Sequence, residues 1–145
     1  MQVVRSRTSL RFALLCLPLL IPSFGFAQDH IQTGELKGFT RSPEEHIINR
    51  IDTPFAVREV KGTALLGDGE PAAGMLLELR GPNNAMSILS TKTKPTGEFH
   101  LKHVRPGNYL FKATLPGFQS VVGTIIVSPK ATGSQVITIQ MKPGV

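Results

Sequence analysis

The sequence predicts an all-β protein, a seven-stranded antiparallel β-sandwich of the Greek-key type, with one short helix near its N-terminus. Short runs rich in β-branched and aromatic residues recur along residues 57–145, and turns rich in Gly and Pro separate them. Apolar and polar residues alternate within these runs, as expected for strands that bury one face. Because no helical pattern lies between the runs, a parallel sheet with crossover helices is not expected.

Seven strands are expected in this region. They lie near residues 58–66, 75–80, 86–94, 98–103, 108–115, 120–128 and 135–141. The apolar members of the alternating runs are predicted to form the core, and they include Phe99, Leu101, Tyr109, Phe111, Ala113, Ile125, Val127, Ile137, Ile139 and Met141. The polar residues between them, such as Lys102 and Lys112, are expected to face solvent, so their truncation should cost little stability.

A polar segment, residues 28–56, precedes the strands and carries one specific local signal. Ser42 can cap a helix whose first residue is Pro43, and Glu45 lies three residues after the cap, which is the pattern of a capping box. We therefore predict a helix over residues 43–51, with isoleucines on one face. Because so short a helix is unstable alone in water, this face should dock either on its own β-domain or on a partner protein.

The first 27 residues have the organisation of a secretory signal peptide. Three arginines precede a ten-residue apolar run that starts at Phe12, and Gly25-Phe26-Ala27 supplies the small residues that a signal peptidase reads. The apolar run is well short of the roughly 20 residues needed to span a bilayer. We expect cleavage after Ala27, export to the periplasm or the extracellular space, and no stable membrane span in the processed chain. The expected domains are a signal peptide over residues 1–27, an N-terminal segment over 28–56 and a β-sandwich over 57–145.

Charge and cysteine content narrow the classes of function. The full chain has a formal net charge of +6, and loss of the three leader arginines leaves 13 basic and 10 acidic residues. The remaining lysines and arginines are scattered singly, so a nucleic-acid partner is not expected. The single cysteine, Cys16, lies in the leader, and the processed domain must therefore be held together by packing without a disulfide.

Several turn and strand motifs follow one another in a recognisable order. They are Val60-x-Gly62-x-Ala64, Gly69-Glu70-Pro71, Met75-x-Leu77-x-Leu79, Gly97-Glu98-Phe99-His100-Leu101, Arg105-Pro106-Gly107-Asn108-Tyr109-x-Phe111, Pro116-Gly117-Phe118 and Ile137-x-Ile139-x-Met141. This order resembles the carboxypeptidase regulatory-like domain family over about residues 57–142. The resemblance implies a prealbumin-like sandwich, similar to transthyretin and to the carbohydrate-binding-like fold. Because the motif residues shape turns and core, they indicate the fold more than the function.

Motifs for catalysis and metal binding are sparse in this sequence. The Gly-x-Ser-x-Gly and His-Glu-x-x-His patterns are absent, and we expect no catalytic residues, no cofactor and no metal site. His100 and His103 are three residues apart in an expected strand, so they would point to opposite faces unless the strand ends between them. The transthyretin-like hydrolases end in Tyr-Arg-Gly-Ser, and this chain ends differently, so a hydrolase is a less favoured alternative.

These observations favour a non-catalytic, exported binding or accessory module. The resemblance implies a saccharide ligand such as a cell-envelope polysaccharide, and the alternative is a structural or protein–protein interaction role at the cell envelope. Since strand faces are core or plain polar surface, contacts are expected in loops at one end of the sandwich. The candidate ligand-binding residues are Asn83, Asn84, Arg105, Asn108 and Phe118. Ordinary turn chemistry is the alternative explanation for the asparagines.

Overall fold

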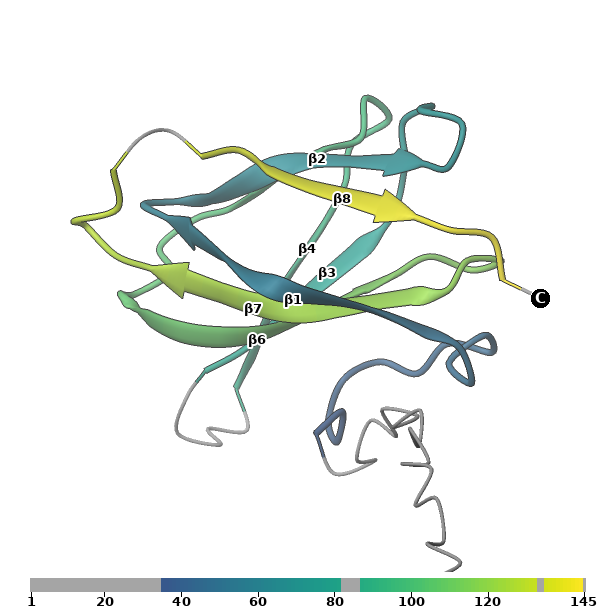
Figure 1. Ribbon diagram of the computed structural model, residues 1–145, viewed down its shortest axis with the longest axis horizontal. Coiled ribbons are helices and arrows are strands. Elements are labelled where there is room, and N and C mark those ends of the chain that lie inside the picture. Colours follow the sequence, from purple (N-terminus) through teal and green to yellow (C-terminus); the bar gives the residue numbers. More distant parts are fainter. Residues whose placement is uncertain (1–34, 82–86, 133–134, 145) are drawn as a thin grey trace, which may run out of the picture. The chain divides into compact units, whose positions relative to one another are not determined.

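The computed structural model describes residues 35–81, 87–132 and 135–144, and this part of the chain is all-β (Figure 1). Its strands are β1 (Ile48–Val57), β2 (Val60–Leu66), β3 (Leu76–Arg80), β4 (Ile88–Lys92), β5 (Glu98–Leu101), β6 (Gly107–Thr114), β7 (Ser120–Val127) and β8 (Ile137–Met141). The seven predicted strands correspond to β2 through β8, and β1 was not predicted. The described residues contain no helix long and apolar enough to cross a membrane.

The strands form two sheets that enclose one hydrophobic core. The larger sheet has the order β1-β7-β6-β3-β4, and the smaller sheet has the order β5-β2-β8. In Figure 1, β2 and β8 form one layer and β1, β7 and β6 belong to the other. The pairs β1–β7 and β2–β8 are parallel, and the strands between them in sequence supply the long connection that a parallel pair needs. The predicted β-sandwich is confirmed, with one strand more than expected and with mixed rather than purely antiparallel sheets.

The core between the sheets includes the residues that the alternation predicted, together with others such as Met75, Leu77 and Leu79. Phe111 and Ile125 of the larger sheet are fully buried together with Ile137 and Ile139 of the smaller sheet. Leu101 is only partly buried but still packs against this cluster. Burial of these side chains supplies most of the stabilisation of a domain that has no disulfide.

The predicted helix over residues 43–51 is wrong. Residues 43–46 form a turn, in which the N–H of Glu45 donates to the carbonyl oxygen of Ser42 at 3.1 Å, and β1 follows almost directly. The β-branched isoleucines suit strand backbone, and pairing with the edge of β7 provides hydrogen bonds that a short helix would have to supply alone. Glu45 does not complete the capping box, because its carboxylate pairs with Lys112 instead.

β1 brings the end of the N-terminal segment into the larger sheet. Residues 48–51 and 55–57 pair with β7, and residues 52–54 bulge out between them. The expected boundary after residue 56 therefore falls at the end of a strand of the sandwich, not in a linker.

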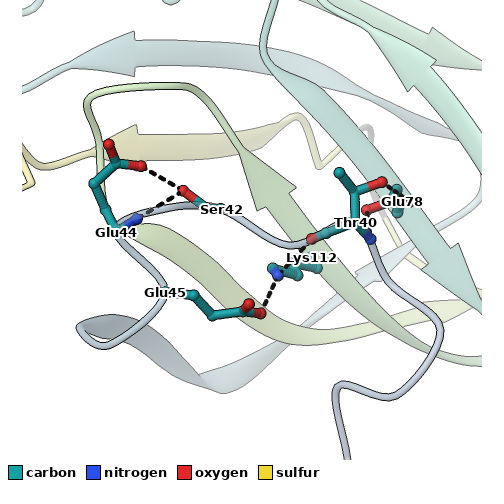
Figure 2. A network of polar contacts seen from close by, with 6 residues as sticks. All are labelled: Thr40, Ser42, Glu44, Glu45, Glu78 and Lys112. Carbon is teal, nitrogen blue, oxygen red and sulfur yellow. Dashed lines mark hydrogen bonds and ion pairs between the residues drawn. The ribbon is translucent and has the colours of Figure 1, made fainter.

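Residues 35–47, which we call the strap, cover the outer face of the larger sheet (Figure 2). The backbone N–H and the hydroxyl of Thr40 donate to the two carboxylate oxygens of Glu78 at 3.0 and 2.9 Å. Lys112 Nζ donates to the carbonyl oxygen of Thr40 at 2.6 Å and pairs with the carboxylate of Glu45. The side chain of Lys112 is 0% exposed. The expectation that Lys112 faces solvent is therefore wrong, because alternation identified its face but not the strap that covers that face.

Two arginines of the larger sheet hold the beginning of the strap. Arg50 pairs with the carboxylate of Glu35 at 2.7 Å. Arg80 donates to the carbonyl oxygen of Lys37 at 2.6 Å and to that of Glu35, and its guanidinium lies 5.0 Å from the ring centroid of the buried Phe39. Of the two docking alternatives for this segment, the structure has it docked on its own β-domain.

Candidate binding cleft at the end of strand β5

One end of the sandwich brings together the turn between β1 and β2 and the loop between β5 and β6. β2 and β5 are antiparallel neighbours, and Val60 at the start of β2 lies opposite Leu101 at the end of β5. Residues 58–59 and 102–104 therefore leave the sheet side by side. Because Val60 and Leu101 are anchored by the core, these two polar segments are presented on a rigid support.

A cleft of about 260 Å³ lies between these two segments. Its lining residues are Arg58, Glu59, Val60, His100, Leu101, Lys102, His103 and Val104. The three apolar residues among them belong to the core or pack against it, and the five polar residues are exposed. The cleft thus combines an apolar base with a polar and mostly basic rim.

The first segment of the cleft is tied to its surroundings by two polar contacts. Arg58 Nε donates to the carbonyl oxygen of Ala131 at 2.9 Å. Glu59 accepts a hydrogen bond from Lys61 Nζ at 3.0 Å, and this bond together with the charge of Lys61 lowers the pKa of Glu59, with a smaller contribution from His100. The carboxylate of Glu59 is therefore ionised and engaged at neutral pH.

The second segment contains an unusual backbone conformation. His103 has a φ of 60°, and it is the only non-glycine residue with a positive φ in the described part of the chain. β5 ends at Leu101, which lies between His100 and His103 in the sequence. The two histidines therefore need not point to opposite faces of a strand, and both line the same cleft. No group of three His, Cys, Asp or Glu among the described residues could hold a metal ion.

Two of the sequence-predicted site residues lie at this end of the sandwich. Arg105 directly follows Val104, and Asn108 is the second residue of β6; both are exposed. The carbonyl oxygen of Arg105 accepts a hydrogen bond from the Tyr109 hydroxyl at 2.8 Å, which closes the turn before β6. The backbone at Arg105 thus has a structural role, while its exposed side chain follows the lining segment in the chain.

The other sequence-predicted residues are not brought to the cleft. Phe118 follows the opposite end of β6, a strand of eight residues and therefore roughly 25 Å long. Its ring is half-buried and packs against the core. Phe118 and Arg105 therefore cannot contact one small ligand together. Asn83 and Asn84 lie outside the described residues.

Sequence reasoning missed Arg58, Lys102 and His103 as possible ligand contacts. The signal for the last two was the run Lys102-His103-x-Arg105, which places three basic residues within four positions just before a Pro-Gly turn. Arg58 could not be found in the same way, because only the pairing of β2 with β5 places it beside that loop.

The fold and the cleft define the class of this protein as a β-sandwich module with its candidate site at one end. The carboxypeptidase regulatory-like domain family matches residues 59–142, which is more than half of the 145-residue chain. The chain therefore belongs to the carboxypeptidase regulatory-like domain family, as its motifs predicted. The match covers β2 through β8, whereas the strap and β1 precede it.

Comparison with solved structures and with curated proteins adds little about function. The 3-chlorocatechol 1,2-dioxygenase from Rhodococcus opacus 1CP matches with a TM-score of 0.43 at 12% identity, over 72% of this chain and 69% of that chain. The catechol 1,2-dioxygenase from Pseudomonas arvilla C-1 matches with a TM-score of 0.40 at 10% identity, over 72% of this chain and 60% of that chain. No curated protein matches the chain significantly. Scores this low carry no argument about activity.

Proposed function

We propose that the protein is a non-catalytic, exported binding module that takes a saccharide of the cell envelope in the cleft at the end of β5. The composition of the cleft carries this proposal. Apolar Leu101 and Val104 lie beside the exposed polar side chains of Arg58, His100 and Lys102. A sugar presents both C–H faces and hydroxyl groups, and a lining of this kind can contact both.

The available rings indicate how a sugar would be held. The chain has no Trp, and Tyr109 is 8% exposed with its hydroxyl engaged by the backbone. Phe118 lies at the other end of the sandwich, so the imidazoles of His100 and His103 are the only aromatic rings among the described lining residues. Hydrogen bonds and charged groups would therefore contribute more to binding than ring stacking.

Glycan-array binding by the processed protein tests this proposal. His100→Ala removes an exposed polar group from the cleft, whereas Phe118→Ala changes the opposite end and is the matched control. We expect binding of envelope-type polysaccharides to be weakened by His100→Ala and retained by Phe118→Ala. The reverse pattern would move the site to the turn between β6 and β7, and absence of any glycan signal would reject the proposal.

Export is part of the proposal and is supported by the signal-peptide pattern of the first 27 residues. Mass spectrometry of the protein isolated from its own cells should identify a chain that starts at Gln28. A folded cytosolic pool that retains Met1 would contradict export without bearing on the cleft.

A protein-interaction role at the cell envelope is the second candidate, and β4 favours it. β4 is the outermost strand at one side of the larger sheet, and Leu89 on this strand is 37% exposed. An exposed edge strand can pair with a strand of a partner. Leu89→Lys should abolish capture of an envelope protein in a pull-down if the edge is used. Capture that is unchanged by this substitution would exclude β4 as the interface.

A further inference from the structure

The cleft at the end of β5 has an excess of positive charge. Among its described lining residues, Arg58 and Lys102 are cationic and Glu59 is the only carboxylate. Glu59 is already engaged by Lys61, which adds a further cation next to the cleft. Arg105 follows the lining segment and is exposed. The cleft therefore favours a negatively charged ligand.

Lys102 and Arg105 differ from the cations that hold the strap. On the larger sheet, Arg50 and Lys112 pair with carboxylates of the strap, and Arg80 binds strap carbonyl oxygens. Within residues 35–81, 87–132 and 135–144, in contrast, the side chains of Lys102 and Arg105 form no hydrogen bond or ion pair. These two cations are thus not needed to hold the fold together, and they are available to a ligand.

The backbone at His103 provides an independent observation. Every other positive-φ residue in the described part of the chain is a glycine. A β-carbon is unfavourable at such a position, and strained backbone of this kind concentrates at functional sites. At φ 60° the chain nevertheless carries an imidazole, and that residue lines the cleft. The strained backbone of the described chain, outside its glycines, thus lies at a residue of the cleft.

We propose that the cleft recognises an anionic group, a carboxylate or a phosphate, carried by a cell-envelope polysaccharide, with Arg58, Lys102 and His103 as its contacts. This inference rests on the proposed function and narrows it to acidic polymers. The planar guanidinium of Arg58 can donate two parallel hydrogen bonds to either group, and Lys102 adds a point charge. The apolar lining residues then contact the sugar ring next to the anionic group.

Affinity electrophoresis of the processed protein through gels containing one polymer each tests the inference. The probes are polygalacturonate for carboxylates, poly(glycerol phosphate) for phosphates and dextran as a neutral polymer. We expect retardation by at least one anionic polymer, weakened by added salt because the contacts are partly exposed. The double variant Arg58→Ala/Lys102→Ala should bind that polymer roughly tenfold more weakly.

The matched control is Lys92→Ala/Lys142→Ala, which removes the same charge from two exposed positions near the opposite end of the sandwich. Its affinity for the anionic polymer should match that of the unmodified protein. Equal losses in both double variants would indicate a general charge effect and overturn the site.

His103→Gly separates a ligand contact from a structural role. Glycine tolerates the left-handed backbone, so the melting temperature should be kept or raised, while affinity for the anionic polymer falls. Unchanged affinity would remove His103 from the site.

The polymers also distinguish failure of this inference from failure of the proposed function. Retardation by dextran alone, or anionic binding that survives Arg58→Ala/Lys102→Ala, would overturn the anionic cleft and leave saccharide binding in place. No retardation by any of the three polymers, together with an empty glycan array, would reject both.

Discussion

The outward-facing residues of the two sheets differ in exposure to solvent: a row on the larger sheet is covered, whereas those of the smaller sheet are exposed. On the larger sheet, the row that crosses β3, β6, β7 and β1 consists of Glu78, Lys112, Val122 and Arg50. The strap pairs with the three charged members of this row, and Figure 2 shows its contacts with Glu78 and Lys112. On the smaller sheet, the outward residues of β5 and β8, such as His100, Thr138 and Gln140, are exposed.

The difference shows that hydrophobic alternation identifies the face of a sheet that packs on the core. It does not show whether the opposite face is covered or exposed. Lys112 and Gln140 occupy equivalent places in alternating strands, and both were expected to face solvent. Lys112 is nevertheless 0% exposed, because a segment far from it in the sequence folds over it. The covered face stabilises the fold through a polar network, and the bare face leaves side chains available for binding next to the cleft.

The largest expected losses of stability come from substitutions in the core, which both sheets share. Phe111 of the larger sheet is 0% exposed and Phe99 of the smaller sheet is 3% exposed. Phe→Ala at either position should lower the free energy of unfolding by about 3–5 kcal/mol in urea denaturation. Similar losses of unfolding free energy at both positions would show that the two sheets contribute alike to the core and differ only in their outer faces. A loss below about 1 kcal/mol at one position would mean that its side chain does not fill the core.

The next effect tests the covered face directly. Lys112→Ala should cost about 2–3 kcal/mol, because it leaves the Thr40 carbonyl oxygen and the Glu45 carboxylate without their partner. Lys61→Ala, on the bare outer face of β2, removes an exposed pair with Glu59 and should cost much less, because solvent screens such a pair. Urea denaturation of both variants measures the contrast. Equal small losses would indicate that the strap does not stabilise the sheet.

The smallest effect is a pH dependence carried by the strap. A hydrogen bond from Ser42 at 2.5 Å is the main cause that lowers the pKa of Glu44 from its ordinary value of 4.5, and backbone N–H groups, including that of Gly117, add to it. Because the pKa of Glu44 is lowered in the folded state, its contribution to stability is present above pH 4.5 and is lost as the pH falls below that value.

The melting temperature of the unmodified protein should therefore decrease more steeply below this pH than that of Glu44→Gln. Parallel curves for the two proteins between about pH 5 and pH 3 would contradict a role for Glu44 in holding the strap. Glu70→Gln, the same substitution at an exposed position between β2 and β3, is a suitable control.

The sequence by itself determined the elements whose signal is local. Alternation and turn chemistry are properties of neighbouring residues, so strands β2 through β8 and their core-facing side chains could be predicted, and so could the family. The candidates Arg105 and Asn108 beside the Pro-Gly turn likewise lie at the end of the sandwich that holds the cleft, although the basic run before that turn was not recognised.

Only the tertiary structure decided the features that depend on distant partners. The segment after Ser42 has the local signature of a helix, but it forms a turn and then β1, because Lys112 takes the Glu45 carboxylate and β7 provides hydrogen bonds along its edge. The same applies to the cleft, where Arg58 reaches the His100–Val104 segment only through the pairing of β2 with β5. Charged side chains and strand edges find their partners across the fold, and no pattern of neighbouring residues records which partner that is.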